Sequence, residues 1–187
     1  MDDLYLKLVL EGDTSKYSYF IEKYKHMAFS IAVRIVDNRE DAEEIVQDAF
    51  VKAFKSLDKF RKDSKFSTWF YRIVVNSSLS KARNKRPESS MEDMEELEEV
   101  VIESVESAYQ SLTLSEQKYF IQHALEELKA EDRMLLTLRY LNENSIDEIT
   151  VITGIVQENV KMKLYRARNK MYNVLNNNLK SEIRSIL

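Results

Sequence analysis

Apolar residues recur at helical spacing through most of the chain. The clearest case is the stretch DAEEIVQDAFVKAF, residues 41–54, where one apolar stripe runs along a helix of 3.6 residues per turn. We expect that stripe to be buried and the acidic residues on the opposite side to face water or a partner. The stripe consists of Ala42, Ile45, Val46, Ala49, Phe50, Ala53 and Phe54.

The same periodicity predicts a four-helix unit in the N-terminal part and four further helices in the C-terminal part. The N-terminal helices are expected at about residues 4–10, 17–36, 39–57 and 67–84, with Ser67 or Thr68 capping the last one. The C-terminal helices are expected at about residues 113–128, 130–141, 145–153 and 157–177. Thr113 and Glu116 have the spacing of a capping box.

Composition restricts the fold class and the possible chemistry. The 187 residues include no cysteine, one proline and two glycines, so disulfides and thiolate metal sites are excluded and hairpin turns are scarce. The prediction is therefore an all-α protein. No apolar run approaches the length that spans a bilayer, and the N-terminus opens with acidic residues. We expect no membrane insertion and a cytoplasmic location.

Charge is distributed unevenly along the chain and suggests two domains. The only proline, Pro87, opens residues 87–116, which hold no Lys or Arg and ten of the 32 acidic residues. The parts on either side, residues 1–86 and 117–187, both carry a small excess of basic residues. We predict two small helical domains joined by an acidic linker.

Residues 145–171 have the pattern of a helix-turn-helix. Ser145 can cap a short helix, and Gly154 can supply the left-handed residue between that helix and the next. Basic residues flank the exposed side of the second helix, as in a helix that lies in the major groove, although an ordinary charged surface helix has the same appearance. The expected core positions are Val160, Leu164, Ala167 and Met171, and the opposite face holds Glu158, Met162, Tyr165 and Asn169.

Aromatic and basic residues alternate in residues 60–86. Rings that stack on unpaired bases, with cations that hold phosphates, form a platform for single-stranded nucleic acid. Phe60 and Phe66 bracket a polar loop and are expected to be exposed. Four other apolar residues share one helical face and are expected to be buried: Trp69, Phe70, Ile73 and Val74.

Three stretches of the chain resemble a known family. The stretches DAEEIVQDAFVKAFKSLDKF, FSTWFYRIVVN and SIDEITVITGIVQENVKMKLYRAR occur in the order and spacing of a bacterial RNA polymerase sigma factor of the small extracytoplasmic-function type. The resemblance implies that residues 1–86 are sigma region 2 and residues 117–187 are sigma region 4. It also implies core RNA polymerase, promoter DNA and an anti-sigma factor as partners, with contacts to the clamp coiled coil and the flap of the enzyme.

The resemblance assigns a role to three sets of residues. The face that docks on polymerase comprises Asp41, Glu44, Gln47 and Asp48. The minus-10 element is held by Phe60, Lys62, Phe66, Arg72, Asn76, Arg83 and Arg86. The minus-35 element is read by Asn159, Lys161, Met162, Lys163, Tyr165 and Arg166. The start of the second helix, at Val156 to Asn159, departs from the family pattern and leaves the promoter preference open.

An enzymatic role has little support in the sequence. His26 and His123 lie in different parts of the chain, and two glycines cannot form a phosphate-binding loop, so we expect no catalytic residue, cofactor or metal. Two other classes remain as alternatives: a helix-turn-helix repressor that never binds polymerase, and a helical adaptor that binds only protein. A repressor would normally form dimers that bind paired half-sites.

Overall fold

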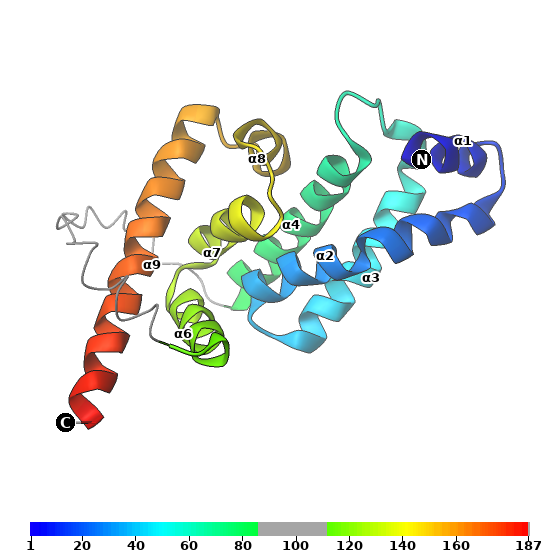
Figure 1. The fold of residues 1–187 in the computed structure, drawn as a ribbon. Helices are drawn as coiled ribbons and strands as arrows, with labels where there is room; N and C mark the ends of the chain where they lie inside the picture. Colours follow the sequence, from blue (N-terminus) through cyan, green and yellow to red (C-terminus); the bar gives the residue numbers. More distant parts are fainter. Residues whose placement is uncertain (86–111, 187) are drawn as a thin grey trace.

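The computed structural model describes residues 1–85 and 112–186, and these residues form helices, turns and loops without a strand. The N-terminal unit consists of α1 (Asp2–Leu10), η1 (Thr14–Tyr17), α2 (Ser18–Val36), α3 (Arg39–Lys55), η2 (Leu57–Lys59) and α4 (Phe66–Lys85). The C-terminal unit consists of α6 (Leu114–Glu127), α7 (Ala130–Leu136), η3 (Thr137–Leu141), α8 (Ile146–Thr153) and α9 (Gln157–Ile186) (Figure 1). The predicted all-α fold is confirmed. The expected linker lies mostly outside the described residues.

Helices α2, α3 and α4 pack around the core of the N-terminal unit. The predicted stripe of α3 faces this core: six of its residues are buried, while Phe54, at the end of the helix, is 39% exposed. Rings from α2, α3 and α4 meet there, with the Phe20 and Phe66 centroids 4.3 Å apart and those of Phe50 and Phe70 4.4 Å apart. An aromatic cluster therefore lies directly behind α4.

Side-chain caps fix the starts of three helices. Asn38 accepts a hydrogen bond from the Asp41 amide at 2.8 Å and so caps α3. The predicted capping box of Thr113 and Glu116 is present at α6, and Ser145 caps α8 in a second box. The prediction for α4 was wrong, because this helix begins at Phe66 and the two candidate caps lie inside its first turn.

Two helices of the C-terminal unit differ in length from the prediction. The helix expected at 130–141 is α-helical only to Leu136, and a π-helical segment follows in which the Asn142 amide donates to the Thr137 carbonyl. Helix α9 continues to Ile186, nine residues beyond its expected end. A small apolar cluster holds this extension against α6, and it consists of Leu112, Phe120, Tyr172, Leu175 and Leu179.

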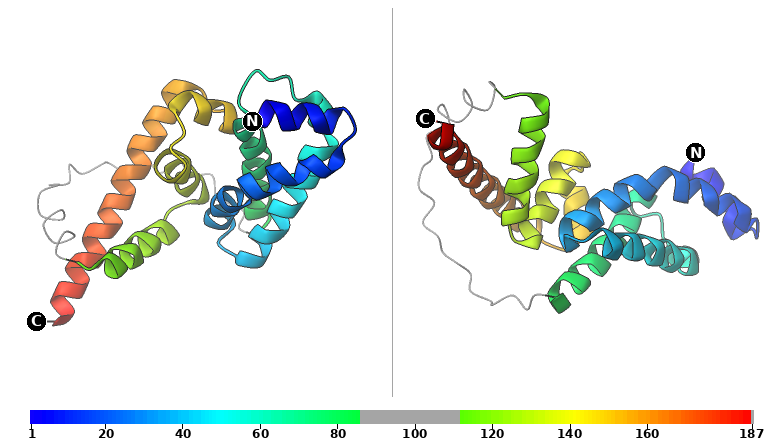
Figure 2. Two further views of the ribbon diagram at one scale, coloured as in Figure 1. Left: turned by 45° about the vertical axis from the view of Figure 1, so that its right-hand side comes forward. Right: turned by 90° about the horizontal axis from the view of Figure 1, so that it is seen from below.

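The two units pack directly on each other. Helix α8 lies against α4, and α7 lies against α2, so that one continuous cluster of buried side chains runs through both units. Figure 2 shows this arrangement from two further sides. Among the helices of residues 1–85 and 112–186, none has the length and apolar composition needed to cross a membrane.

Candidate protein and nucleic-acid interfaces

The polar face of α3 carries the four side chains that we expected to bind polymerase. Gln47 and Asp48 are exposed there. The other two meet Lys81 of α4, whose Nζ lies 2.8 Å from Glu44 Oε2 and 3.3 Å from Asp41 Oδ1. The hydrogen bonds to Glu44 and Asp41 raise the pKa of Lys81. The acidic face is thus partly neutralised by the neighbouring helix, a contact between distant segments that helical periodicity cannot predict.

Helix α4 presents an exposed polar stripe next to that acidic face. Arg72, Asn76 and Arg83 are spaced four and seven residues apart, which places them on one side of the helix, and all three are exposed. The other cation expected here, Arg86, lies outside the described residues. The described part of the stripe therefore offers two guanidinium groups and one amide to a ligand.

The expected exposure of Phe66 was wrong. This side chain is 4% exposed and belongs to the aromatic cluster, where its ring stacks at 6.0 Å on that of Phe70. Phe60 is partly buried, with its ring centroid 5.2 Å from that of Trp69. The expected burial of Phe70 and Val74 is confirmed, whereas Trp69 and Ile73 are only partly buried. The aromatic residues thus support α4 from behind more than they cover its surface.

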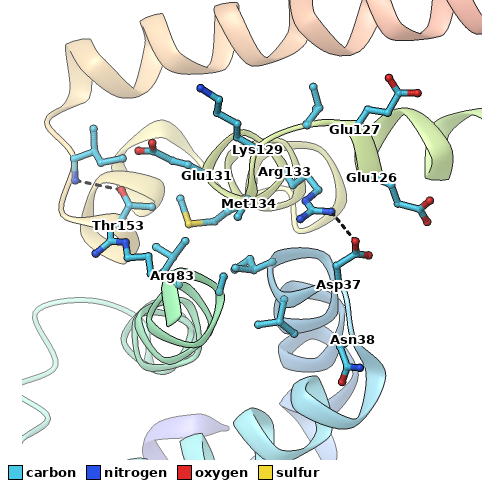
Figure 3. A pocket seen from close by; sticks show the side chains of 17 residues that line it. Asp37, Asn38, Arg83, Glu126, Glu127, Lys129, Glu131, Arg133, Met134 and Thr153 are labelled. Carbon is cyan, nitrogen blue, oxygen red and sulfur yellow. Dashed lines mark hydrogen bonds and ion pairs between the residues drawn. The ribbon is translucent and has the colours of Figure 1, made fainter. Parts of the chain in front are cut away.

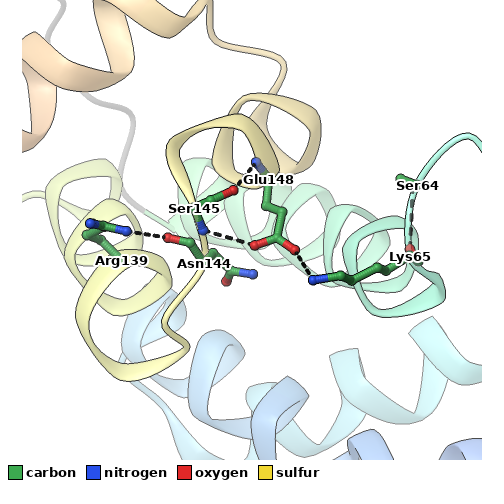
Figure 4. A network of polar contacts seen from close by, with 6 residues as sticks. All are labelled: Ser64, Lys65, Arg139, Asn144, Ser145 and Glu148. Atoms are coloured by element: carbon green, nitrogen blue, oxygen red, sulfur yellow. Dashed lines mark hydrogen bonds and ion pairs between the residues drawn. The ribbon is translucent and has the colours of Figure 1, made fainter.

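The loop before α4 contributes two lysines with different partners. Lys62 has a left-handed backbone, with φ of 61°, and its Nζ lies 3.8 Å from an oxygen of Asp3. Lys65 donates a hydrogen bond of 2.8 Å to Glu148 of α8, in the other unit (Figure 4). That bond, together with one from the Ser145 amide, lowers the pKa of Glu148. One carboxylate therefore completes a helix cap and also joins the two units.

Helix α9 shows the predicted division between a buried and an exposed face. Val160, Leu164 and Ala167 are buried, and Met171 packs against the core. Glu158, Met162 and Tyr165 are exposed on the other side, while Asn169 is half-buried. Three more of the side chains expected to bind DNA are exposed beside this face: Asn159, Lys161 and Arg166.

Acidic residues of α7 pair with one basic flank of α9. Lys163 Nζ lies 3.1 Å from Glu131 Oε1, and Lys170 Nζ lies 3.4 Å from Asp132 Oδ2. Lys163, which we expected to contact DNA, is therefore paired with a carboxylate of its own chain, although its side chain is partly exposed. At the start of the helix, where the family pattern is absent, the Gln157 side chain donates to Asp147 of α8 at 2.8 Å.

A pocket of about 600 Å³ lies between the two units (Figure 3). Arg83 of α4 and Thr153 and Ile155 at the end of α8 line one side, and Asp37 and Arg133 line the other, with 3.5 Å between Oδ2 and Nη1. No pattern in the sequence predicts this pocket. Among the described residues, no group of three or more His, Cys, Asp or Glu side chains is placed to hold a metal ion.

Two family models match the chain in the order that the helices follow. Sigma-70 region 2 matches residues 20–88, and Sigma-70, region 4 matches residues 121–171. The first match includes most of α2 and all of α3 and α4, and the second includes α7, α8 and the N-terminal half of α9.

Curated relatives and solved structures agree with these matches. The chain is 32% identical over 178 residues to the ECF RNA polymerase sigma-E factor of Escherichia coli K12, covering 92% of this chain and 93% of that protein. It is 31% identical over 175 residues to the ECF RNA polymerase sigma factor SigW of Bacillus subtilis, with 89% and 92% covered. Its fold is similar to CnrH in complex with the cytosolic domain of CnrY (TM-score 0.66, 20% identity, 92% and 96% covered). It is also similar to RpoE of Bartonella quintana in complex with the anti-sigma factor NepR (0.61, 21%, 84% and 96%).

Proposed function

Because this chain belongs to the extracytoplasmic-function group of the sigma-70 family, we propose that its two helical units divide the steps of initiation between three helix faces. Members of this family are non-enzymatic initiation factors that bind core RNA polymerase and direct promoter recognition and opening. The assignment of each step to a face of α3, α4 or α9 is our proposal. We assign residues 1–86 to region 2, residues 87–116 to a linker and residues 117–187 to region 4.

The acidic face of α3 docks on the clamp coiled coil of polymerase. Four polar side chains share this face, and two of them, Gln47 and Asp48, are exposed. Asp41 and Glu44 share Lys81, so the enzyme must either accept this ion-pair cluster as it stands or replace Lys81 with a cation of its own. Charge complementarity of this kind sets the orientation and rate of docking.

The exposed stripe of α4 holds the unpaired strand of the minus-10 element. Asn76 lies between two exposed guanidinium groups, those of Arg72 and Arg83, which suit phosphates on either side of a base. Extruding a base costs a few kcal/mol, and the amide of Asn76 can donate to and accept from a base edge. Phe60 and Lys62 complete this surface from the preceding loop.

The exposed face of α9 reads the minus-35 element in the major groove. Met162 and Tyr165 stand at its centre, 46% and 53% exposed, with Asn159, Lys161 and Arg166 around them. Lys163 joins this set when DNA replaces Glu131 as its partner. A methionine and a tyrosine at the centre favour apolar contact with thymine methyl groups over a purely hydrogen-bonded code.

The chain acts in the cytoplasm and is controlled there by an anti-sigma factor. Two observations support these assignments: a protein similar in fold is bound to the anti-sigma factor NepR, and another is bound to the cytosolic domain of CnrY. The flap of polymerase is the expected contact of region 4.

The observation that carries this proposal is that both family matches contain a helix with an exposed polar face backed by a buried core. The test is reconstitution with core polymerase and run-off transcription on genomic fragments. We expect transcripts from a subset of fragments that appear only when the protein is added. Failure to bind core polymerase, combined with dimers that bind duplex DNA, would favour the repressor alternative.

A further inference from the structure

One basic flank of α9 is occupied by acidic side chains of its own unit. Lys163 and Lys170 lie about two helical turns apart on this flank, and each meets one of two neighbouring acids at the start of α7. Their Nζ atoms lie 3.1 Å from Glu131 Oε1 and 3.4 Å from Asp132 Oδ2. The four side chains are between 15% and 44% exposed, so a ligand can reach both pairs.

The backbone that carries these two acids is fixed beside α9. The four residues that follow Asp132, from Arg133 to Leu136, are all buried. Helices α7 and α9 also pack against each other. The carboxylates therefore stay next to the basic flank, whereas acids on a long loop would be able to swing away into water.

The opposite flank of α9 has no such partners. Lys161 and Arg168 are both exposed, and neither forms an ion pair in the part of the chain that the structure describes. The Arg168 guanidinium instead lies over the ring of Tyr165, 5.8 Å from its centroid. A DNA strand can therefore approach this flank without displacing a carboxylate.

This asymmetry acts differently on non-specific and specific DNA binding. Affinity for DNA of any sequence comes from cations that neutralise phosphates and release counterions. A lysine that keeps its carboxylate brings no net charge to the duplex and therefore releases no counterion. A helix that is seated by base contacts holds its flank against the phosphates, and a phosphate can then take the place of the carboxylate. Exposed ion pairs are weak enough to permit this exchange.

We propose that Glu131 and Asp132 set the sequence specificity of α9, because they keep Lys163 and Lys170 from phosphates until the minus-35 element is correctly seated. The two carboxylates are resident substitutes for phosphate oxygens. They reduce the affinity for DNA of other sequences more than the affinity for the promoter. This inference rests on the proposed function of α9, and its test separates the two.

The first measurement is the affinity of the full-length protein for a labelled duplex of mixed sequence at several salt concentrations. The α7 variant carries Glu131→Gln and Asp132→Asn, which keep the size and one acceptor oxygen of each side chain. The matched control, Glu11→Gln with Glu22→Gln, removes the same charge and also releases two lysines, but in the other unit. Urea denaturation checks that both variants are folded.

We expect the two freed lysines to add two phosphate contacts, each of which steepens the slope of log affinity against log salt by about 0.9. The ratio of the affinities at about 50 and 200 mM salt should therefore be roughly tenfold larger for the α7 variant than for the control. Glu131→Gln alone is a milder variant and should give half the change in slope. Adding Lys163→Ala to it should remove that change. Equal slopes for the α7 variant and the control would overturn the proposal.

The second measurement repeats the titration on a promoter duplex identified by run-off transcription. Lys163 already contacts a phosphate in that complex, so the α7 variant should steepen the slope by at most about 0.9, half of the change on mixed-sequence DNA. The ratio of promoter affinity to mixed-sequence affinity should therefore fall. An equal gain on the two duplexes would show that the acids weaken all DNA binding alike, and it would overturn their role in specificity.

A failure of the proposed function of α9 would give a different result. Lys161→Ala with Arg168→Ala changes only the flank without ion pairs and should lower the slope on mixed-sequence DNA by about 1.8. If the slope is unchanged, duplex DNA does not lie on α9 and the proposed function fails. If the slope falls while the α7 variant matches its control, only the role of Glu131 and Asp132 is excluded.

Discussion

Helices α4 and α9 both present an exposed face to nucleic acid, but different side chains support them from behind. The buried side of α4 carries Phe66 and Phe70, whose rings pack in stacked and tilted pairs with each other and with Phe20 of α2 and Phe50 of α3. Behind α9 are the smaller side chains of Val160, Leu164 and Ala167, supplemented by ion pairs to α7. One helix is thus held mainly by buried rings, and the other by aliphatic packing and partly buried ion pairs.

This difference matches the two tasks that we propose. A surface that receives an extruded base must keep its geometry while DNA changes shape, and large rings packed at many contacts resist displacement. A helix that lies in an intact major groove reads an existing structure, and its ion pairs can exchange partners with phosphates. The comparison predicts that substitutions of buried residues affect α4 most, through stability. It predicts that changes in charge or salt concentration affect α9 most, through its affinity for DNA.

The largest expected effect is from Phe66→Ala. Removing this ring leaves a cavity among five other aromatic residues, and we expect the free energy of unfolding to fall by about 3–5 kcal/mol. The control, Tyr165→Ala, removes a ring of similar size that is 53% exposed on α9, and should change stability by less than about 0.5 kcal/mol. Urea denaturation of both variants checks this. Similar midpoints for the two would show that α4 does not depend on the aromatic cluster.

The second-largest expected effect is on the binding of α3 to core polymerase. Glu44→Arg together with Asp48→Arg should abolish binding to core polymerase while helicity is retained, because both carboxylates lie outside the buried stripe. The control pair is Glu11→Arg with Glu22→Arg, which makes the same change in charge just after α1 and on α2. Binding to core polymerase is measured by size-exclusion chromatography or anisotropy. If the first variant binds as tightly as the unsubstituted protein, this face of α3 is not the polymerase-binding surface.

Local signals in the sequence were sufficient for the helices and for the exposed sides of α3 and α9. Helix caps such as Thr113 and Ser145 act on residues only a few positions away, and so do apolar residues at helical spacing. Both features can therefore be recognised from the sequence alone. The extension of α9 was missed because three successive asparagines, poor helix formers, precede Leu179. Packing of that leucine and Tyr172 against Phe120 overrides the local preference.

Features that depend on distant segments could not be predicted in the same way. Phe60 and Phe66 flank one loop and have the same residue type, yet only Phe66 points into the core, which depends on Phe20 and Phe70 of other helices. The pairing of Lys81 with the acidic face of α3 joins residues about 40 positions apart. The contact between Lys65 and Glu148 spans 83 positions and joins separate units.

A smaller effect should follow from Asn76→Ala. Asn76 is exposed and outside the core, so stability should be unchanged, while the rate of open-complex formation should fall by about tenfold, the value of one lost hydrogen bond to a base. Closed-complex affinity should change little. The measurement compares duplex promoter with a template melted in advance, on which the defect should shrink. An unchanged opening rate on the duplex promoter would show that Asn76 has no role in promoter opening.

The comparison also predicts that two cations of α9 behave differently. Arg166→Ala should weaken minus-35 binding and lower the slope of log affinity against log salt by about one, if its exposed guanidinium holds one phosphate. Lys163→Ala should have a smaller effect, because DNA must first displace Glu131 from this lysine. Both are measured by titration at several salt concentrations. Equal slopes for the two variants would mean that the ion pair to α7 is irrelevant to binding.

The smallest expected effect separates the two capping boxes of the C-terminal unit. Thr113→Ala and Ser145→Ala should each cost about 1 kcal/mol of stability. The loss at Ser145 should be the larger one, because its box includes Glu148, which also binds Lys65 of the other unit. Equal losses in urea denaturation would mean that the bond between the units adds nothing to this cap.

The dependence of stability on pH provides a second measurement of the difference between the two capping boxes. Hydrogen bonds from Thr113 lower the pKa of Glu116, and those from Lys65 and Ser145 lower that of Glu148, in both cases from an ordinary value of 4.5. A carboxyl group whose pKa is lower in the folded protein stabilises it above the unfolded value and loses this contribution as pH falls through the folded value. Stability should therefore decline below about pH 4.5.

Glu148→Gln should flatten that decline, and raising the salt concentration should reproduce part of its effect, because Lys65 is exposed and its attraction is screened. Glu116→Gln should also flatten the decline, but this variant should keep the salt response of the unsubstituted protein, because the pair between Lys65 and Glu148 remains; Glu148→Gln should lose that response. An identical salt response of the two variants would show that Lys65 contributes nothing to the contact between the units.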